Sequence, residues 1–252
     1  MPAGLATRIG IITLGDYIDL ASLTVAQYYT GTMADWPHPE SNGEITRNTN
    51  PPMSNNSTLL RLIVVGINTY SGINGNGNAP HIVFQFQNLP GFHRMNPTDT
   101  NVGGYAASEM RKYLVPVSGV GGTGNFLTGL INAGVPEDFL WAPSRRVWNG
   151  SGSEVAGTIE DTIFLPTAWE MFGENRSSHS TYETVDNQGR FAYYTSNNSR
   201  MKRRLAGFEA GSEYWEASPY MSTRFTSVAS PGYSDLEWAE TVLPFAPAFC
   251  VK

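Results

Sequence analysis

The chain has 252 residues, of which 40% are hydrophobic and 12% aromatic, and this is enough apolar material to bury the core of one large domain. Its formal net charge is −6 with only 16 lysines and arginines, which argues against a surface that neutralises nucleic-acid phosphates. The single cysteine, Cys250, excludes an intrachain disulfide and a multi-cysteine metal site, and its neighbours Phe249 and Val251 predict a buried strand thiol.

The amino-terminal part of the chain is expected to contain an opening strand, a long polar loop and a hairpin. Residues 9–28 mix short apolar runs with Gly and Asp, and residues 31–58 are rich in Asn, Pro, Ser and Thr. The run at 59–67 is continuous and β-branched, whereas residues 81–87 alternate apolar with polar side chains at a period of two. Because the turn-rich stretch 72–78 lies between these two runs, they predict a β-hairpin.

Short helices and strands are expected in the middle of the chain. Residues 108–114 and 125–131 have helical spacing, and each stretch opens at a capping residue or a glycine. Thr167 and Glu170 have the spacing of a capping box, which predicts another short helix. Residues 191–204 are a weaker helix candidate. Strands are expected at residues 139–142, 145–148 and 161–165.

The carboxy-terminal segment, residues 213–252, has the composition of a contact surface held on a buried frame. Its two ends are apolar, around Tyr214 and Trp215 and again at 243–251, and mainly Ser, Thr, Tyr, Trp, Arg, Asp and Glu fill the region between them. Tyr and Trp give contact area at a low cost in rotamer entropy, and Ser and Thr give adaptable hydrogen bonds, so binding surfaces favour this mixture. Strands are expected at residues 213–218, 224–229 and 242–251.

The order of these elements indicates the fold class. Strands early and late in the sequence with short helices between them predict an α+β fold in which the terminal strands meet in one sheet. No linker or internal repeat divides the chain, so residues 1–252 are interpreted as one domain. No stretch of about 18 apolar residues predicts a transmembrane helix, and the amino terminus lacks the pattern of a secretory signal.

Seven short motifs, taken in their order along the chain, resemble those of the DUF6273 domains of bacteria and phages. The motifs are GYAASEMRKYL (104–114), NFL (125–127), FLPTAWEMF (164–172), YY (193–194), NSRMK (198–202), YWEASP (214–219) and APAFC (246–250). The resemblance covers residues 100–252 well and residues 9–100 loosely. It implies a C-type lectin-like fold of the formylglycine-generating-enzyme-like branch, with short helices around a small mixed or antiparallel sheet and many loops. Several such domains are similar to the variable proteins of diversity-generating retroelements, whose carboxy-terminal segment is rewritten at adenine-rich codons.

The resemblance implies a ligand-binding protein that is not an enzyme. Strands at 214–219 and 246–251 would form the frame, and residues 220–240 would form a variable surface that meets a protein or glycan on another cell or particle. It also implies a place on a virion or a cell surface. The side chains expected to be exposed for ligand binding are Tyr220, Ser222, Thr223, Arg224, Thr226, Ser227, Tyr233, Asp235, Glu237, Trp238 and Glu240.

The tryptophans fall into two groups. Trp141, Trp148 and Trp169 stand in apolar strand or helix contexts and are expected in the core. Trp238 stands in a polar stretch close to Glu237 and is either an exposed binding anchor or a side chain packed under a loop.

Enzymatic and metal chemistry find little support in the sequence. With one cysteine, the cysteine pair of formylglycine-generating oxidases is missing. The tripeptides that ligate calcium in sugar-binding C-type lectins do not occur either, so we expect no cofactor and no catalytic residue. Asp99 and Asn101, together with Asp186 and Asn187, could ligate a structural ion or could instead form ordinary Asx turns.

Two other functions stay open at this point. The polar carboxy-terminal segment could be a subunit interface of a structural virion or surface-appendage protein. Alternatively, His93, Arg94 and Asp99, a polar cluster next to a glycine-rich stretch, could form an enzyme site. The one basic run, at 200–204, is interpreted as a solvated helix end or a partner of nearby glutamates rather than a nucleic-acid contact.

Overall fold

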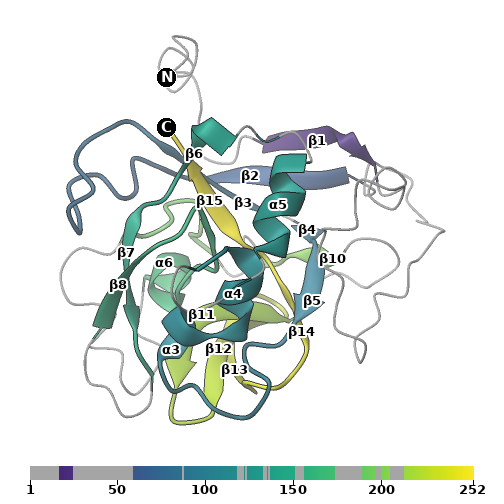
Figure 1. Cartoon of the computed structure of the whole chain (residues 1–252). Coiled ribbons are helices and arrows are strands. Elements are labelled where there is room, and N and C mark those ends of the chain that lie inside the picture. Colours follow the sequence, from purple (N-terminus) through teal and green to yellow (C-terminus); the bar gives the residue numbers. More distant parts are fainter. Residues whose placement is uncertain are drawn as a thin grey trace.

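Strands dominate the fold, and a few short helices connect them (Figure 1). The computed structural model describes residues 17–24, 59–86, 88–117, 122, 124–132, 135, 137–150, 156–173, 189–196, 200–204 and 213–252. The expected α+β class is confirmed in these residues. The expected loop at 31–58 lies outside them.

The first sheet joins the two ends of the chain. Its strands are β1 (Tyr17–Thr24), β2 (Leu59–Ile67), β3 (Ile82–Phe86), β6 (Leu140–Trp141), β9 (Ile163–Phe164) and β15 (Ala248–Val251). The order is β1-β2-β3-β15-β6, and β9 also pairs with β15. The antiparallel pair β2 and β3 is the predicted hairpin, and the predicted meeting of early and late strands is confirmed because β15 lies next to β3. Figure 1 shows β15 crossing the middle of the molecule.

The second sheet contains most of the carboxy-terminal segment. Its strands are β5 (Gly91–His93), β11 (Tyr214–Tyr220), β12 (Arg224–Ala229), β13 (Tyr233–Trp238) and β14 (Leu243–Phe245). The order is β13-β12-β11-β14-β5, with β13 at the edge. One strand was expected over 242–251, and this is wrong. Ala246 and Pro247 carry the chain from β14 in this sheet to β15 in the first sheet, and Pro247 has no N–H to continue a ladder.

Short helices and two small sheets complete the described structure. The helices are α3 (Gly104–Ala107), α4 (Glu109–Leu114), α5 (Asn125–Asn132), α6 (Ala168–Phe172) and the 3-10 turn η1 (Glu137–Phe139). The small sheets pair β4 (Asn88–Leu89) with β10 (Arg203–Arg204) and β7 (Ser144–Trp148) with β8 (Ala156–Glu160). The predicted capping box is present, since Thr167 accepts from the N–H of Glu170 and Glu170 accepts from the N–H of Thr167. None of the described helices is both long and apolar enough to cross a membrane.

The core has two parts, which lie on opposite faces of the first sheet. On β2 and β15, Val64 and Phe249 belong to one cluster, whereas Val65 and Cys250 belong to the other. This division follows from the period of two along a strand, which sends successive side chains to opposite faces. Both faces are therefore covered. Cys250 is fully buried, as expected, and burial raises the pKa of its thiol.

The segment 191–204 differs from expectation. Its described part contains turns at 191–196 and the strand β10, so a continuous helix is wrong. The solvated interpretation of the basic run is wrong as well, because Arg200 and Lys202 are only 6% and 2% exposed. The Arg200 guanidinium donates to the carbonyl of Met171, and the Lys202 Nζ donates to the Tyr194 hydroxyl at 2.8 Å. Burial lowers the pKa of Lys202 to about 7.

Candidate functional site

The segment expected to display a binding surface folds into a three-stranded antiparallel meander of β11, β12 and β13. Arg224 lies opposite Trp238, and Val228 lies opposite Ser234, so the register of β12 and β13 is regular along its length. The strand β13 was not expected from the sequence. Its side chains are all exposed or half-exposed, in keeping with its place at the edge of the sheet.

Exposed apolar side chains gather on this meander. Among the described residues, the large hydrophobic side chains that are exposed are Val102 (65%), Met221 (54%), Tyr233 (53%) and Trp238 (44%). Three of the four belong to residues 220–240. The fourth, Val102, follows Asn101, whose N–H donates to the carbonyl of Ser222 at 3.1 Å. The loop that carries Val102 is thus bonded to the turn between β11 and β12, although it is distant in the sequence.

Arg224 and Trp238 form a stacked pair across β12 and β13. The guanidinium carbon of Arg224 lies 4.2 Å from the centroid of the Trp238 ring. Such a cation–π contact contributes about 0.5–1 kcal/mol at an exposed site and restrains both long side chains. Trp238 is 44% exposed, so the interpretation as a side chain packed under a loop is wrong. The pair forms a partly ordered, amphipathic anchor on the surface.

Most of the side chains expected to be exposed are exposed or half-exposed, and two are not. The accessible ones are Tyr220, Ser222, Thr223, Arg224, Tyr233, Asp235, Glu237, Trp238 and Glu240. Thr226 and Ser227 are fully buried, so the expectation is wrong for these two. Both use their hydroxyls inside the sheet. Thr226 donates to the carbonyl of Ser218 at 3.2 Å, and Ser227 donates to Glu213 at 2.5 Å.

Carboxylates surround the buried hydroxyl of Ser227. Burial raises the pKa of Glu213, and the nearby charges of Glu237 and Asp235 raise it further, whereas the hydrogen bond from Ser227 lowers it. Asp235 also accepts from the N–H of Leu236 at 2.8 Å. That bond occupies a backbone donor of the edge strand, and charged side chains on an edge oppose pairing with another chain. The meander is therefore better suited to contacts through its side chains than through added strands.

The frame below the meander is buried and tied to the rest of the molecule. The indole N–H of Trp215 donates to the carbonyl of His93 at 2.8 Å. Between Trp215 and Pro219 the pairing of β11 with β12 shifts, and β11 turns to α6 instead. There the N–H of Ala217 donates to Pro166, and the Ser218 hydroxyl accepts from the N–H of Ala168 at 2.9 Å.

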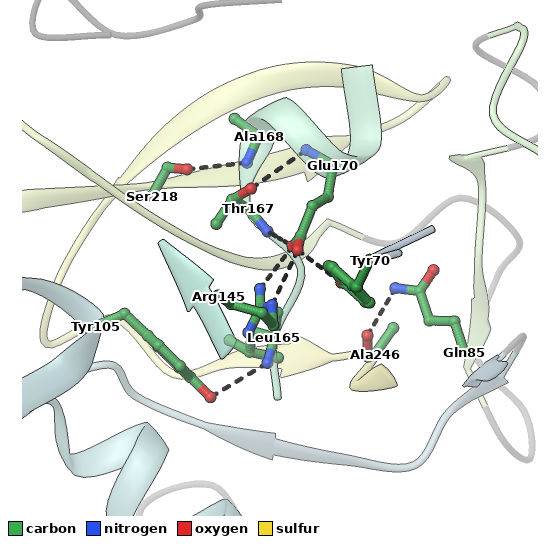
Figure 2. A network of polar contacts seen from close by, with 10 residues as sticks. All are labelled: Tyr70, Gln85, Tyr105, Arg145, Leu165, Thr167, Ala168, Glu170, Ser218 and Ala246. Atoms are coloured by element: carbon green, nitrogen blue, oxygen red, sulfur yellow. Dashed lines mark hydrogen bonds and ion pairs between the residues drawn. The ribbon is translucent and has the colours of Figure 1, made fainter. Parts of the chain in front are cut away.

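A buried polar network holds α6 in place beside this frame (Figure 2). Glu170, from the capping box, accepts from Arg145 at 2.6 and 2.9 Å and from the Tyr70 hydroxyl at 2.7 Å. Arg145 also donates to the carbonyl of Leu165 and lies 3.7 Å from the centroid of the Phe164 ring. The side chains of Arg145 and Glu170 are 0% exposed. Both side chains are therefore shielded from solvent, as expected of a network that supports the scaffold.

The polar cluster considered as an enzyme site is divided between the core and the surface. His93 is 5% exposed, stacks on Tyr113 at 4.3 Å, and has its Nδ1 2.6 Å from the carbonyl of Arg94. Asp99 instead accepts from the N–H of Glu240 at 3.3 Å, at the end of the meander.

Asp99 and Asn101, which were considered as ligands of a structural ion, each bond to the main chain of the carboxy-terminal segment. Within the part of the chain that the structure describes, no group of three metal-ligating side chains lies together. Asp186 and Asn187 are outside that part. Asn101 is fully buried, and its amide nitrogen contacts the carbonyls of residues 220, 221 and 224.

The exposed Met221 and the buried Asn101 were not among the positions expected from the sequence. The expected exposed positions were polar or aromatic, which left Met221 out. Nothing in the local sequence places Asn101 beside the meander, because its partners lie about 120 residues further along the chain. No family model, curated protein or solved structure matches this chain.

Proposed function

We propose that this protein binds a macromolecular ligand, a protein or glycan on another cell or particle, through the surface formed by residues 220–240. The supporting observation is that three of the four exposed large apolar side chains of the described residues, Met221, Tyr233 and Trp238, lie on one meander, where Trp238 also stacks with Arg224. Exposed apolar patches rimmed by polar groups mark interaction sites, and Trp, Tyr and Arg dominate binding energy at protein interfaces.

The proposal includes a C-type lectin-like fold in which buried strands carry the surface. The burial of β11 and β15 supports it, because both strands suit the role of a frame. It also includes diversification of the carboxy-terminal segment by a retroelement. A near-copy of the codons for residues 213–250 beside a reverse-transcriptase gene, differing mainly at adenines, would support that part; its absence from the genome would count against it.

Alanine substitution tests the binding surface. A variant with Tyr220, Arg224, Tyr233 and Trp238 all changed to alanine should lose binding on arrays of glycans and of cell-surface ectodomains. Its melting temperature should stay within a few degrees of the parent, because these side chains are exposed or half-exposed. The matched control changes Thr158 and Glu160, which are exposed on β8, and should bind as the parent does.

Three outcomes would contradict the proposal. The first is a parent protein that binds nothing on the arrays, and the second is a quadruple variant that binds as the parent does. The third outcome is a stable homo-oligomer, measured by light scattering after size exclusion, that the quadruple variant dissociates. In that case the same surface would be a subunit interface of a structural protein.

A further inference from the structure

One residue outside the carboxy-terminal segment holds the turn between β11 and β12. The side-chain amide nitrogen of Asn101 lies 3.0 Å from the carbonyl oxygen of Tyr220, 2.9 Å from that of Met221 and 2.9 Å from that of Arg224. Its backbone N–H donates to the carbonyl of Ser222 at 3.1 Å. Asn101 is fully buried, so these contacts are shielded from water.

The carbonyl of Thr223 is the one carbonyl of the turn that Asn101 does not contact, and it also accepts a hydrogen bond. Thr223 accepts from the N–H of Ala239 at 2.9 Å. Each of the five carbonyls from residue 220 to residue 224 therefore lies within hydrogen-bond distance of a donor outside the turn, and the two amide hydrogens of Asn101 are shared among three of them. Each of these bonds ends on the main chain, which every residue type provides.

Close packing of the backbone fixes Asn101 itself. Its carbonyl accepts from the N–H of Gly104 at 2.9 Å. A Cβ placed on Gly150 would lie 1.8 Å from that same carbonyl oxygen, and Gly150 has a φ of 75°. A side chain at position 150 would displace the Asn101 loop. The clamp therefore depends on Gly150, in the segment that follows β7.

We infer that Asn101 is a positioning residue of the recognition surface: it fixes the main chain of residues 220–224 through contacts that do not depend on which side chains these residues carry. This inference rests on the proposed function for its biological meaning. Its physical content does not, because the clamp is a property of the unliganded protein. The stacking of Arg224 on Trp238 depends on Asn101, because Arg224 is both the last residue that Asn101 contacts and the first residue of β12.

Two substitutions at position 101 separate donation from packing. Asn101→Asp is nearly isosteric but replaces the donor group with an oxygen that faces carbonyl oxygens. Asn101→Ala removes the whole side-chain amide. If Asn101 acts by donation, the aspartate variant is the less stable of the two at pH 8, and both melt at least about 5 °C below the parent. Lowering the pH protonates the carboxyl group and returns one donor, so only the aspartate variant should recover towards pH 5.

A spectroscopic signal reports on the turn directly. Incorporation of 5-fluorotryptophan gives a fluorine resonance for Trp238, which Trp238→Phe assigns. Both substitutions at position 101 should move this resonance towards its position in Arg224→Ala. The matched control is Asn76→Ala. The side-chain amide of Asn76, in the connection between β2 and β3, bonds both backbone groups of Ser144 at the start of β7. This change should lower the melting temperature without moving the Trp238 resonance.

Exchange of the turn side chains completes the experiment. The triple change Met221→Asn, Ser222→Ala and Thr223→Ala should keep the melting temperature within about 3 °C of the parent, because the clamp contacts only the main chain. An aspartate variant as stable as the parent, or a triple variant that unfolds, would overturn the inference. None of these measurements uses a ligand, so a failure of ligand binding is recorded separately by the arrays.

Discussion

Met221 shows how tightly the turn is constrained at the level of one residue. Its φ of 50° lies in the left-handed region, which non-glycine residues adopt at a cost of about 1 kcal/mol. Met221→Gly should leave the melting temperature unchanged or slightly higher, because the relieved strain offsets the greater freedom of the unfolded chain. Met221→Val should lower it by several degrees, since a β-branched residue tolerates this conformation poorly.

Circular dichroism during heating measures both variants. Tyr233→Val is the matched control, because Tyr233 is exposed to a similar extent but lies in a strand, where valine is favoured. If Met221→Val melts with the parent, the left-handed conformation does not constrain the turn.

Lys202 should make stability depend on pH at the alkaline side of neutrality. Burial lowers its pKa from 10.5 to about 7. Between these values the unfolded chain binds a proton that the folded chain does not, so stability rises with pH across this window. Lys202→Met removes this dependence. The variant should gain most over the parent at pH 7, and its advantage should shrink towards pH 9.5. An advantage that stays constant over that range would show that Lys202 keeps its proton when folded.

Ion pairs that support individual elements should differ in how much they contribute to the free energy of unfolding, according to how deeply they are buried. Glu170→Gln leaves the buried Arg145 guanidinium without its counter-charge and should destabilise the fold by about 3–5 kcal/mol. The exposed pair of Lys112 and Glu109 provides the matched control, and Glu109→Gln should cost about 1 kcal/mol or less. Urea unfolding measures both free energies. Similar values for the two variants would mean that the buried pair does not support α6.

Elements with a strong local pattern could be predicted from the sequence, and those that depend on distant partners could not. The hairpin of β2 and β3 follows from a β-branched run and an alternating run, and α6 follows from the spacing of Thr167 and Glu170. The edge strand β13 mixes polar with aromatic residues and buries none of its side chains, so its pattern indicated a displayed segment. Pro247 is a local signal for the break between β14 and β15, but the transfer of the chain from one sheet to the other depends on distant strands.

The exposure of the residues expected to bind ligand could be predicted in part. Composition indicated a displayed segment between two apolar ends and the resemblance narrowed it to 220–240, but Thr226 and Ser227 are buried in β12, which lies between β11 and β13. The clamp by Asn101 could not be anticipated, because an asparagine in a polar loop has the same appearance whether it turns, binds an ion or donates to a distant strand.

At the scale of the whole molecule, β15 should be indispensable. It pairs with β3, β6 and β9, and its side chains contribute to both core clusters. A chain that stops at Pro247 should therefore show neither a cooperative melting transition nor a dispersed proton NMR spectrum. A chain lacking only Lys252 should melt within a few degrees of the parent. A cooperative transition in the shorter chain would show that β15 is peripheral.

The position of β15 also affects the order in which the protein becomes functional. A ribosome makes the turn and strands of residues 213–245 before it makes Ala248–Val251, and domains complete their folding only when all their strands are available. A chain that stalls before Ala248, or is cut there by a protease, thus carries the exposed residues of the meander but lacks β15, the strand of the first sheet against which both core clusters pack. If the meander binds a ligand as proposed, chains without β15 cannot present it in a folded protein, so the fold itself screens out such chains.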